Sequence, residues 1–379
     1  MSRHEAKFIK EIIKVVLNKL EPKYLYVPEH LVGMDQLARN IFDFLSTATD
    51  DVCIVGMHGM PGIGKTTIAE VVFNQLCNGF EGSCFLSDIN ERSKQFNGGL
   101  VDLQKQLLHD ILKQDVANIN CVDRGKVLIK ERLCRKRVLV VADDVAHLDQ
   151  RKALMGDRSW LGPGSRVIIT TRDSNLLRKA DRTYQIEELT RDQSLQLFSW
   201  HAFKDTKPAE DYIELSKKAV DYCGGLPLAL DVMGACLSGK NRDGWKSVID
   251  KLKRIPNHDI QGKLRISYDL LDGEELKNAF LDIACFFIDR KKEYIAKLLG
   301  ARCGYNPEVD LQTLHERSLI KVLGETVTMH DLLRDMGREV VRESSPKEPG
   351  KRTRIWNQED AWNVLEQLKV KKNSHGTLD

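Results

Sequence analysis

The spacing of apolar residues changes character near Leu189. Between Asp51 and Leu189, short apolar runs alternate with stretches in which apolar residues recur every three or four positions. The runs predict strands and the recurrences predict amphipathic helices. The predicted strands are Val52–Met57, Ser83–Ile89, Val138–Ala142, Arg166–Thr170 and Thr183–Ile186, and the clearest helices between them are Lys65–Cys77, Leu100–Lys113 and Arg124–Leu133. This alternation indicates an α/β fold with a parallel sheet covered on both faces.

The flanking regions are helical in pattern. On the N-terminal side, Ile9 to Leu20 and Leu37 to Leu45 each carry one apolar face. On the C-terminal side, helices are predicted at Ser194–Phe203, Tyr212–Tyr222, Leu228–Leu237 and Gly244–Leu252. More helices follow up to Glu343, with one hairpin signal, Ile320–Val322 and Val327–Met329 around Gly324. Helices followed by a small hairpin predict a winged-helix unit.

These changes of pattern predict five segments. They are a helical linker from an upstream domain at 1–28, an α/β domain at 29–189, a helical domain at 190–260, a winged-helix domain at 261–345 and a second linker at 346–379 with a helical piece around Trp362–Leu368. A chain of 379 residues is long enough for two or three domains of ordinary size.

Composition narrows the class of protein. Charged residues make up 30% of the chain but nearly cancel at a net +3, which argues against a dedicated nucleic-acid or membrane-surface protein. No run of about 18 apolar residues could span a bilayer, and the start lacks an apolar signal core. Nine scattered cysteines without a CxxC pair favour free thiols over zinc ligands or a disulfide framework. We therefore expect a soluble intracellular protein without a membrane partner.

A phosphate-binding loop lies between the first predicted strand and the next helix. Residues 59–66 read Gly-Met-Pro-Gly-Ile-Gly-Lys-Thr and match G-x-x-x-x-G-K-[ST]. Glycines let backbone N–H groups face phosphate oxygens, and the helix N-terminus adds partial positive charge. Lys65 is expected to reach the β- and γ-phosphates, and Thr66 to offer its hydroxyl to Mg²⁺. The predicted nucleotide-binding residues here are Met60, Pro61, Gly62, Ile63, Gly64, Lys65, Thr66 and Thr67. A plain glycine turn is the alternative reading.

Charged residues end two of the other predicted strands. Asp143 and Asp144 follow Val138–Ala142, and Arg172 follows Arg166–Thr170. Ligands of open parallel sheets bind at the carboxyl ends of strands. Asp143 is therefore expected to bind Mg²⁺ together with Thr66. Asp144 is expected to orient or deprotonate an attacking water, and Arg172 to contact the γ-phosphate. The alternatives are an acidic turn for the aspartates and a surface ion pair of Arg172 with Asp173.

The motifs, taken together, resemble those of a known family. The series MPGIGKTT, VVADDV, GSRVIITTR, GLPLAL and MHD, in this order, resembles the NB-ARC module of plant intracellular immune receptors, the NLR family, over roughly residues 25–345. The module is similar to the ATPase of animal apoptosome proteins. FLSDI at 85–89 and FLDIACFF at 280–287 resemble the subclass with an N-terminal TIR domain. The resemblance implies an α/β P-loop NTPase followed by a helical bundle and a winged helix. It also implies an excised portion, without the TIR domain that precedes this module or the leucine-rich repeats that follow it.

The resemblance implies further site residues. Pro227, preceded by Leu226, matches a proline that packs against adenine, and Val32-Gly33 matches a segment that covers the base. His330 matches a histidine that reaches the β-phosphate of ADP. Without the resemblance, Pro227 reads as the first residue of a helix, and His330 as a helix-start residue beside an N-cap Asp331. Asn90 stands where the family often has arginine, and Arg92 could replace it.

The resemblance implies a switch rather than a fast enzyme. An ADP-bound closed state would exchange to an ATP-bound open state that self-associates and triggers defence signalling, with at most slow hydrolysis of ATP. Any NAD hydrolysis would belong to the TIR domain. A pathogen effector would be sensed through the repeats, in the cytoplasm or the nucleus.

Two alternatives remain. One is an ordinary P-loop ATPase with a separate substrate. The other is a nucleic-acid-binding winged helix. Residues 263–350 carry 14 basic and 16 acidic side chains, and no DNA partner is expected for such a balance.

Overall fold

The computed structural model describes residues 24–28, 30–47, 49–94, 98–114, 119–252, 258–269, 271–303 and 307–374. The helix predicted between Ile9 and Leu20 lies outside these residues. The chain divides into two compact units. The first comprises the residues up to Gly59 together with Gly64–Ile186, and the second comprises Met60–Ile63 together with the residues from Glu187 onward.

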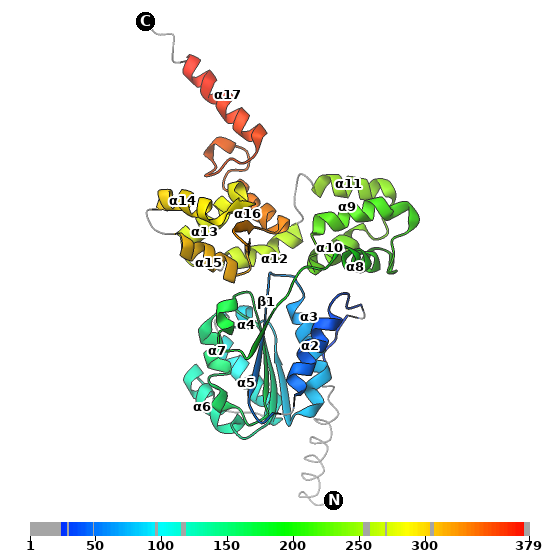
Figure 1. Ribbon diagram of the computed structural model, residues 1–379, viewed down its shortest axis with the longest axis vertical. Helices are drawn as coiled ribbons and strands as arrows, with labels where there is room; N and C mark the ends of the chain where they lie inside the picture. Colours follow the sequence, from blue (N-terminus) through cyan, green and yellow to red (C-terminus); the bar gives the residue numbers. More distant parts are fainter. Residues whose placement is uncertain are drawn as a thin grey trace, which may run out of the picture. The chain divides into compact units, whose positions relative to one another are not determined.

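The first unit is a parallel sheet with helices on both faces. Its strands are β1 (Cys53–His58), β2 (Gly82–Leu86), β3 (Val138–Val145), β4 (Arg166–Thr171) and β5 (Arg182–Gln185), in the order β2-β3-β4-β1-β5. Helices α2 (Asp35–Ser46) and α3 (Lys65–Leu76) lie on one face, and α4 (Ile89–Arg92), α5 (Gly99–Leu112), α6 (Val122–Leu133) and α7 (Leu148–Leu154) lie on the other (Figure 1). β4 thus separates the strand that leads into the phosphate loop from the strand that carries Asp143.

The apolar runs predicted these strands because the central strands are buried on both faces. In β3 and β4 every residue is buried except Asp144. The prediction for the second strand, Ser83–Ile89, is wrong at its end. β2 stops at Leu86, and Ile89 is a fully buried residue of the short helix α4. Asp88, with φ of 51°, turns the chain out of the sheet between them.

The first part of the second unit is a helical bundle. It contains α8 (Arg191–Phe203), α9 (Ile213–Cys223), α10 (Pro227–Leu237) and α11 (Arg242–Leu252), which confirms the four predicted helices. Trp245 is 1% exposed, and its ring packs against the rings of Phe198, Phe203 and Tyr212. This aromatic cluster ties α8 and α11 together.

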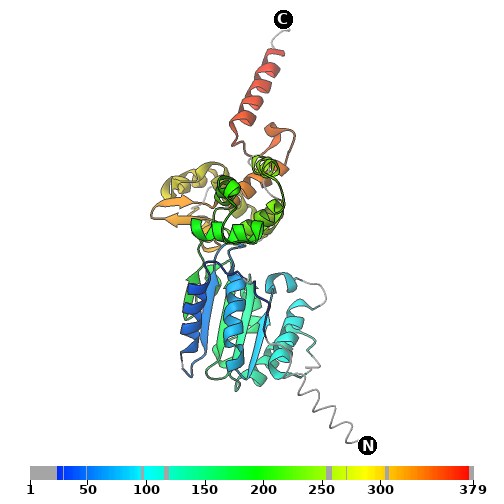
Figure 2. The ribbon, with the colours of Figure 1, turned by 90° about the vertical axis from the view of Figure 1, so that its right-hand side faces the viewer.

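The second part of this unit has a winged-helix fold. Its helices are α12 (His258–Asp269), α13 (Glu274–Asp282), α14 (Lys292–Cys303), α15 (Glu308–Glu316) and α16 (Asp331–Glu343). The predicted hairpin is present as β7 (Lys321–Leu323) and β8 (Thr326–Thr328), drawn in orange in Figure 2. The two-residue strand β6 (Arg290–Lys291) pairs with β8 and was not predicted, since it is charged and short.

The segment after the winged helix is attached to it. Arg354 is 7% exposed and donates to the carboxylate of Asp282 (2.5 Å) and to the side-chain oxygen of Asn278 (2.9 Å) on α13. The last helix, predicted around Trp362–Leu368, is α17 (Gln358–Ser374). Arg354, which was predicted to lie in a linker, is therefore bonded to the winged-helix domain through α13. Among the described residues no helix is both long enough and apolar enough to cross a membrane.

Candidate functional site

The phosphate loop connects β1 to α3 and needs glycine at two positions. Gly62 and Gly64 have φ of 77° and 98°, in the left-handed region that favours glycine. A Cβ at position 64 would also lie 2.5 Å from the Cε of Met34. Gly64 is the N-cap of α3, so the first-turn N–H groups, which have no acceptor within a helix, follow the loop directly. This backbone fits an anion at the start of α3.

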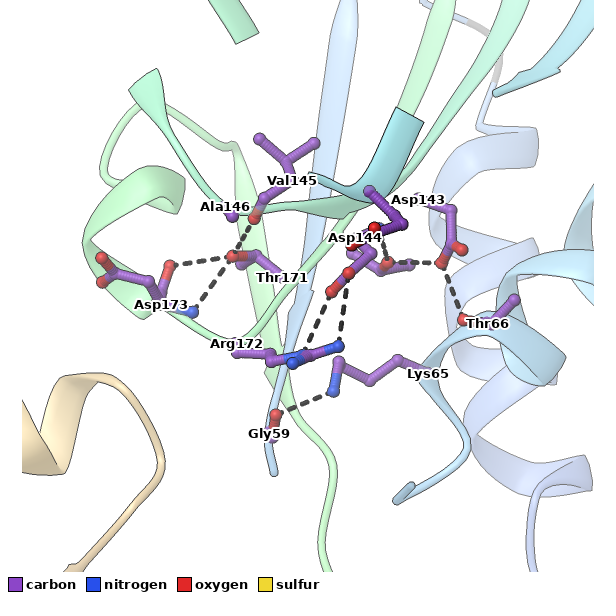
Figure 3. Close-up of polar contacts among 12 residues, drawn as sticks. Gly59, Lys65, Thr66, Asp143, Asp144, Val145, Ala146, Thr171, Arg172 and Asp173 are labelled. Atoms are coloured by element: carbon purple, nitrogen blue, oxygen red, sulfur yellow. Dashed lines mark hydrogen bonds and ion pairs between the residues drawn. The ribbon is translucent and has the colours of Figure 1, made fainter. Parts of the chain in front are cut away.

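Lys65 is buried beside the loop. The residue is 7% exposed, and its Nζ donates to the carbonyl oxygen of Gly59 at 2.8 Å (Figure 3). Burial, assisted by the nearby charge of Arg172, lowers the pKa of Lys65 to about 7, although Asp144 and Asp143 act in the opposite direction. A desolvated ammonium group beside a neutral carbonyl would gain from an anionic ligand.

Asp143 lies next to Thr66, as predicted. The carboxylate Oδ1 accepts hydrogen bonds from the hydroxyls of Thr66 (2.8 Å) and Thr170 (2.6 Å). Asp143 is 1% exposed, and burial raises its pKa, while the two hydroxyl hydrogen bonds oppose the rise. Since Thr66 donates its proton to Asp143, its oxygen lone pairs stay available to a cation.

The donors at this position fit Mg²⁺ better than a metal held by protein side chains alone. No group of three or more His, Cys, Asp or Glu residues suited to a metal ion occurs in the described part of the chain. Mg²⁺ commonly takes one or two carboxylates and completes its shell with phosphate oxygens and water. Thr66 and Asp143 would supply the protein's part of that shell.

Asp144 and Arg172, the two candidate catalytic residues, pair with each other. Arg172 Nε lies 3.2 Å from Asp144 Oδ1, and both side chains are 21% exposed (Figure 3). Asp173, the partner expected for a surface pair, accepts the N–H of Asn175 with its carboxylate at the start of the next turn (3.0 Å). Asp144 has φ of 55°, at an irregularity in the β3–β4 pairing between Ala142 and Val145. The guanidinium of Arg172 is therefore directed to the end of β3.

The segment predicted to cover the base, Val32-Gly33, directly precedes a residue that contacts the loop. Val32 is 9% exposed and Gly33 has φ of 75°, in the turn before α2. The side chain of Met34, the next residue, lies beside Gly64. A contact of Val32 and Gly33 with a base stays a prediction.

The second unit holds Leu226, Pro227 and His330. Pro227 is the first residue of α10, as the helix-start reading predicted, and Leu226 is fully buried. In the same unit, the carbonyl of Gly62 accepts the N–H of Leu228 (3.2 Å). His330, and not Asp331 as expected, is the N-cap of α16, because its Nδ1 accepts the N–H of Leu332 (3.1 Å).

The second ring nitrogen of His330 is also engaged. Nε2 lies 3.0 Å from the carbonyl oxygen of Gly224. Since Nδ1 accepts a hydrogen bond, the neutral ring carries its proton on Nε2 and donates it to Gly224. A phosphate contact by His330 would have to replace this hydrogen bond.

Asn90, which stands where the family often has arginine, and Arg92, its possible replacement, both lie on α4. Asn90 is 1% exposed, and its Oδ1 has no hydrogen-bond partner within the described ranges. Arg92 donates to the carbonyl of Ser87 at 3.4 Å. A phosphate contact by Arg92 therefore stays a hypothesis.

Thr170 is a member of this site that was not predicted. Its hydroxyl contacts Asp143, although neither the loop motif nor the acidic residues of β3 point to it. Its position at the end of a strand, two residues before Arg172, was the signal that could have identified it.

The strand–loop–helix, the buried Lys65 and the Thr66–Asp143 pair define a P-loop fold of the nucleotide-binding type. Residues 34–208 match the NB-ARC domain family, and residues 273–345 match the winged-helix domain of Roq1-like disease resistance proteins. A Walker-type ATPase of Pyrococcus abyssi superposes with a TM-score of 0.54 at 13% identity, over 85% of this chain and 99% of that one, which shows a shared fold.

The relatives are plant resistance proteins. The chain is 42% identical over 358 residues to disease resistance protein RUN1 of Vitis rotundifolia, covering 93% of this chain and 26% of that protein. It is 37% identical over 382 residues to TMV resistance protein N of Nicotiana glutinosa, covering 99% of this chain and 32% of that protein. The chain thus spans about a quarter to a third of the length of these relatives. It belongs to the NB-ARC modules of TIR-type NLR resistance proteins.

Proposed function

We propose that this module is the ADP/ATP-dependent switch of a plant immune receptor. In the proposed closed state ADP is bound, and exchange for ATP opens the module so that it self-associates and triggers defence signalling. The relatives that carry this module are resistance proteins, and it spans only 26% and 32% of two of them. The TIR domain, the leucine-rich repeats, effector sensing through those repeats and a cytoplasmic or nuclear location belong to this proposal for the whole receptor.

The observation that carries the proposal is the Lys65–Thr66–Asp143 cluster at the start of α3. A buried ammonium group, a hydroxyl with lone pairs for a cation and a desolvated carboxylate lie together at the N-terminus of this helix. The ammonium and the helix N–H groups suit the phosphates, and the hydroxyl and carboxylate suit Mg²⁺, which would neutralise phosphate charge when bound.

The state of Asp144 and Arg172 favours slow hydrolysis. Asp144 can orient or deprotonate a water only when its carboxylate is released from Arg172, and Arg172 can reach a γ-phosphate only after the same release. The ion pair therefore opposes both catalytic roles at once. We expect turnover far below the common enzymatic range of about 1–1000 per second. Turnover well above one per second would favour the ordinary ATPase.

The second unit would report which nucleotide is bound. In this proposal Pro227 stacks on adenine and His330 donates its Nε2 proton to the β-phosphate of ADP. The GLPLAL and MHD motifs that the chain shares with the NLR family support these roles. His330 would exchange its hydrogen bond with the carbonyl of Gly224 for the bond to the phosphate. A winged helix that gives up this contact on exchange for ATP would move away from the nucleotide.

The decisive experiment is to identify the nucleotide that copurifies with the protein, by chromatography of the denatured supernatant. We expect near-stoichiometric ADP for the natural chain and a large loss for Lys65→Ala. Lys113→Ala is a matched control, because Lys113 lies at the far end of α5 and outside the loop. Absence of ADP and ATP from the natural chain, together with no saturable binding of added ADP, would refute the switch. A salt-sensitive gel shift with DNA would instead support the nucleic-acid alternative.

A further inference from the structure

Thr170 differs from the other groups near the loop because its hydroxyl bonds to both acidic residues of β3. Thr170 is 1% exposed at the end of β4. Its Oγ1 donates to Asp143 Oδ1 at 2.6 Å and accepts the backbone N–H of Asp144 at 2.8 Å. A hydroxyl has one proton to donate, and Thr170 donates it to the carboxylate of Asp143. One side chain thereby joins both acidic residues of β3 to β4.

The two hydrogen bonds of Thr170 hold the carboxylate of Asp143 and the backbone of Asp144 in place. The bond to Oδ1 helps to fix the rotation of the Asp143 carboxylate, which Thr66 and the backbone of Asp88 also hold by hydrogen bonds. The bond to the N–H of Asp144 supports a non-glycine residue with φ of 55°, a conformation that is costly without such support. The strand order allows this, because β4 lies between β1 and β3.

We propose that Thr170 is a positioning residue for Mg²⁺: it aims the Asp143 carboxylate at the cation and holds the strained backbone of Asp144. Thr170 does not itself touch the cation. This inference rests on the proposed nucleotide site and adds a residue to it. Partners that orient a metal-binding carboxylate commonly change metal affinity about 10- to 100-fold when they are removed.

The neighbouring residue provides a matched control. Thr171 is fully buried on the same strand, and its Oγ1 donates to the carbonyl of Val145 (2.6 Å) and accepts the N–H of Asp173 (3.0 Å). Thr171 is therefore as buried as Thr170 and also bonds through both its proton and a lone pair, but to Val145 and Asp173 rather than to Asp143. Thr170→Val and Thr171→Val each remove one buried hydroxyl of equal size.

The test measures ADP affinity as a function of Mg²⁺ concentration, from chelator-treated buffer upward, with a fluorescent ADP analogue. For Thr170→Val we expect the Mg²⁺ concentration of half-maximal effect to rise about tenfold or more, with Mg²⁺-free affinity within about twofold of the natural chain. Thr170→Ser keeps both hydrogen bonds and should stay within about threefold. Thr171→Val should lower the melting temperature without moving the Mg²⁺ curve.

The outcomes separate this inference from the proposed function. A natural chain that binds no ADP at any Mg²⁺ concentration refutes the nucleotide switch itself. If the natural chain binds ADP, then a Thr170→Val curve that coincides with the Thr171→Val curve overturns the role of Thr170 alone. The role of Thr170 is also overturned if the Thr170→Ser curve is shifted as far as the Thr170→Val curve. It is overturned as well if the ADP affinity of the natural chain does not depend on Mg²⁺ concentration.

Discussion

At the scale of single residues, Lys65 combines a positive charge with almost complete burial. Its pKa of about 7 is set mainly by desolvation, and the carboxylates of Asp144 and Asp143 only partly offset this effect. The folded-state pKa therefore lies below the value of 10.5 for an exposed lysine. Between these two values the unfolded chain binds more protons, so without ligand this group makes stability rise with pH across that window.

Lys65 should make nucleotide binding depend on pH in the opposite sense. Phosphate beside the ammonium group favours its charged form, so binding raises the pKa and takes up a proton above pH 7. We expect ADP affinity to fall on the order of tenfold or more between pH 7 and pH 9. Calorimetry at pH 8 in two buffers of different ionisation enthalpy measures the proton uptake directly.

The control for this pH dependence is Lys65→Arg. A guanidinium keeps its charge throughout this range. Any affinity that this variant retains should vary much less with pH, and binding should take up no proton. Equal pH profiles for the two chains would contradict the role of the Lys65 ammonium.

Other pairings at the residue scale could not be predicted from sequence order. Asp173 is next to Arg172 in the chain, yet Arg172 pairs with Asp144, which is 28 positions away. This pairing depends on strand order, which places the end of β4 beside the end of β3.

The phosphate loop was predictable because its chemistry is contained in eight consecutive residues. Thr170 was missed because its partners, Asp143 and Asp144, lie on another strand, and its position at the end of β4 was the one sequence signal for it.

At the scale of secondary-structure elements, one turn joins the helical bundle to the winged helix. Gly224 ends α9 with φ of 57°, and its carbonyl accepts the Nε2 proton of His330 at the start of α16. A Cβ at position 224 would lie 2.8 Å from Cε1 and Nε2 of His330. Glycine is therefore required here both for the backbone conformation and for the approach of the imidazole.

Gly224→Ala should thus destabilise the protein more than its backbone strain alone explains. Gly239 is the matched control, because it has φ of 72° and a Cβ there would meet none of the described atoms within 4 Å beyond its chain neighbours. We expect Gly239→Ala to cost about 1 kcal/mol in the free energy of unfolding and Gly224→Ala to cost clearly more. The excess should largely disappear in a His330→Ala background, as measured by denaturant unfolding. If the two substitutions lower the free energy of unfolding equally, then the side chain of His330 does not clash with a Cβ at position 224.

The elements themselves were predicted with uneven success, for physical reasons. Central strands are buried on both faces and give continuous apolar runs, so β1, β3 and β4 were found within a few residues. Ile89 extended the second run past its true end, since a buried residue of a short helix looks the same in sequence as a strand residue. The seven residues of α7 are too few for a clear helical period.

At the scale of the whole molecule, the winged helix is bonded to the residues at which the chain enters the second unit for good, Glu187 and Glu188. Lys321 on β7 donates to Glu187 (2.8 Å) and Glu188 (2.6 Å), which follow directly after Ile186, the last residue of the first unit. Burial alone would raise the pKa of Glu188, but the hydrogen bond and charge of Lys321 lower it overall. Burial alone would lower the pKa of Lys321, but the two carboxylates outweigh it and raise this pKa.

The pH window of this contact follows from those directions. Stability from Glu188 is present above its ordinary pKa of 4.5 and is lost as the pH falls through the lower folded value. Stability from Lys321 is present below its ordinary 10.5 and is lost as the pH rises through the higher folded value. The contact is therefore fully formed at neutral pH. Because Lys321 is 36% exposed, we assign it no more than about 1 kcal/mol.

If opening of the winged helix accompanies nucleotide exchange, this contact should slow it. Lys321→Glu places a third carboxylate beside Glu187 and Glu188, and we expect ADP to dissociate several-fold faster in a chase experiment with excess unlabelled ADP. Lys291→Glu is the control, because its pair with Glu325 lies in the same small sheet but is 72% and 79% exposed, a kind of pair that contributes little. Exchanging the charges, with Glu187→Lys and Glu188→Lys added to Lys321→Glu, would leave one carboxylate between two ammonium groups and restore much of the slow rate. Equal dissociation rates for Lys321→Glu and Lys291→Glu would mean that this contact does not restrain the winged helix.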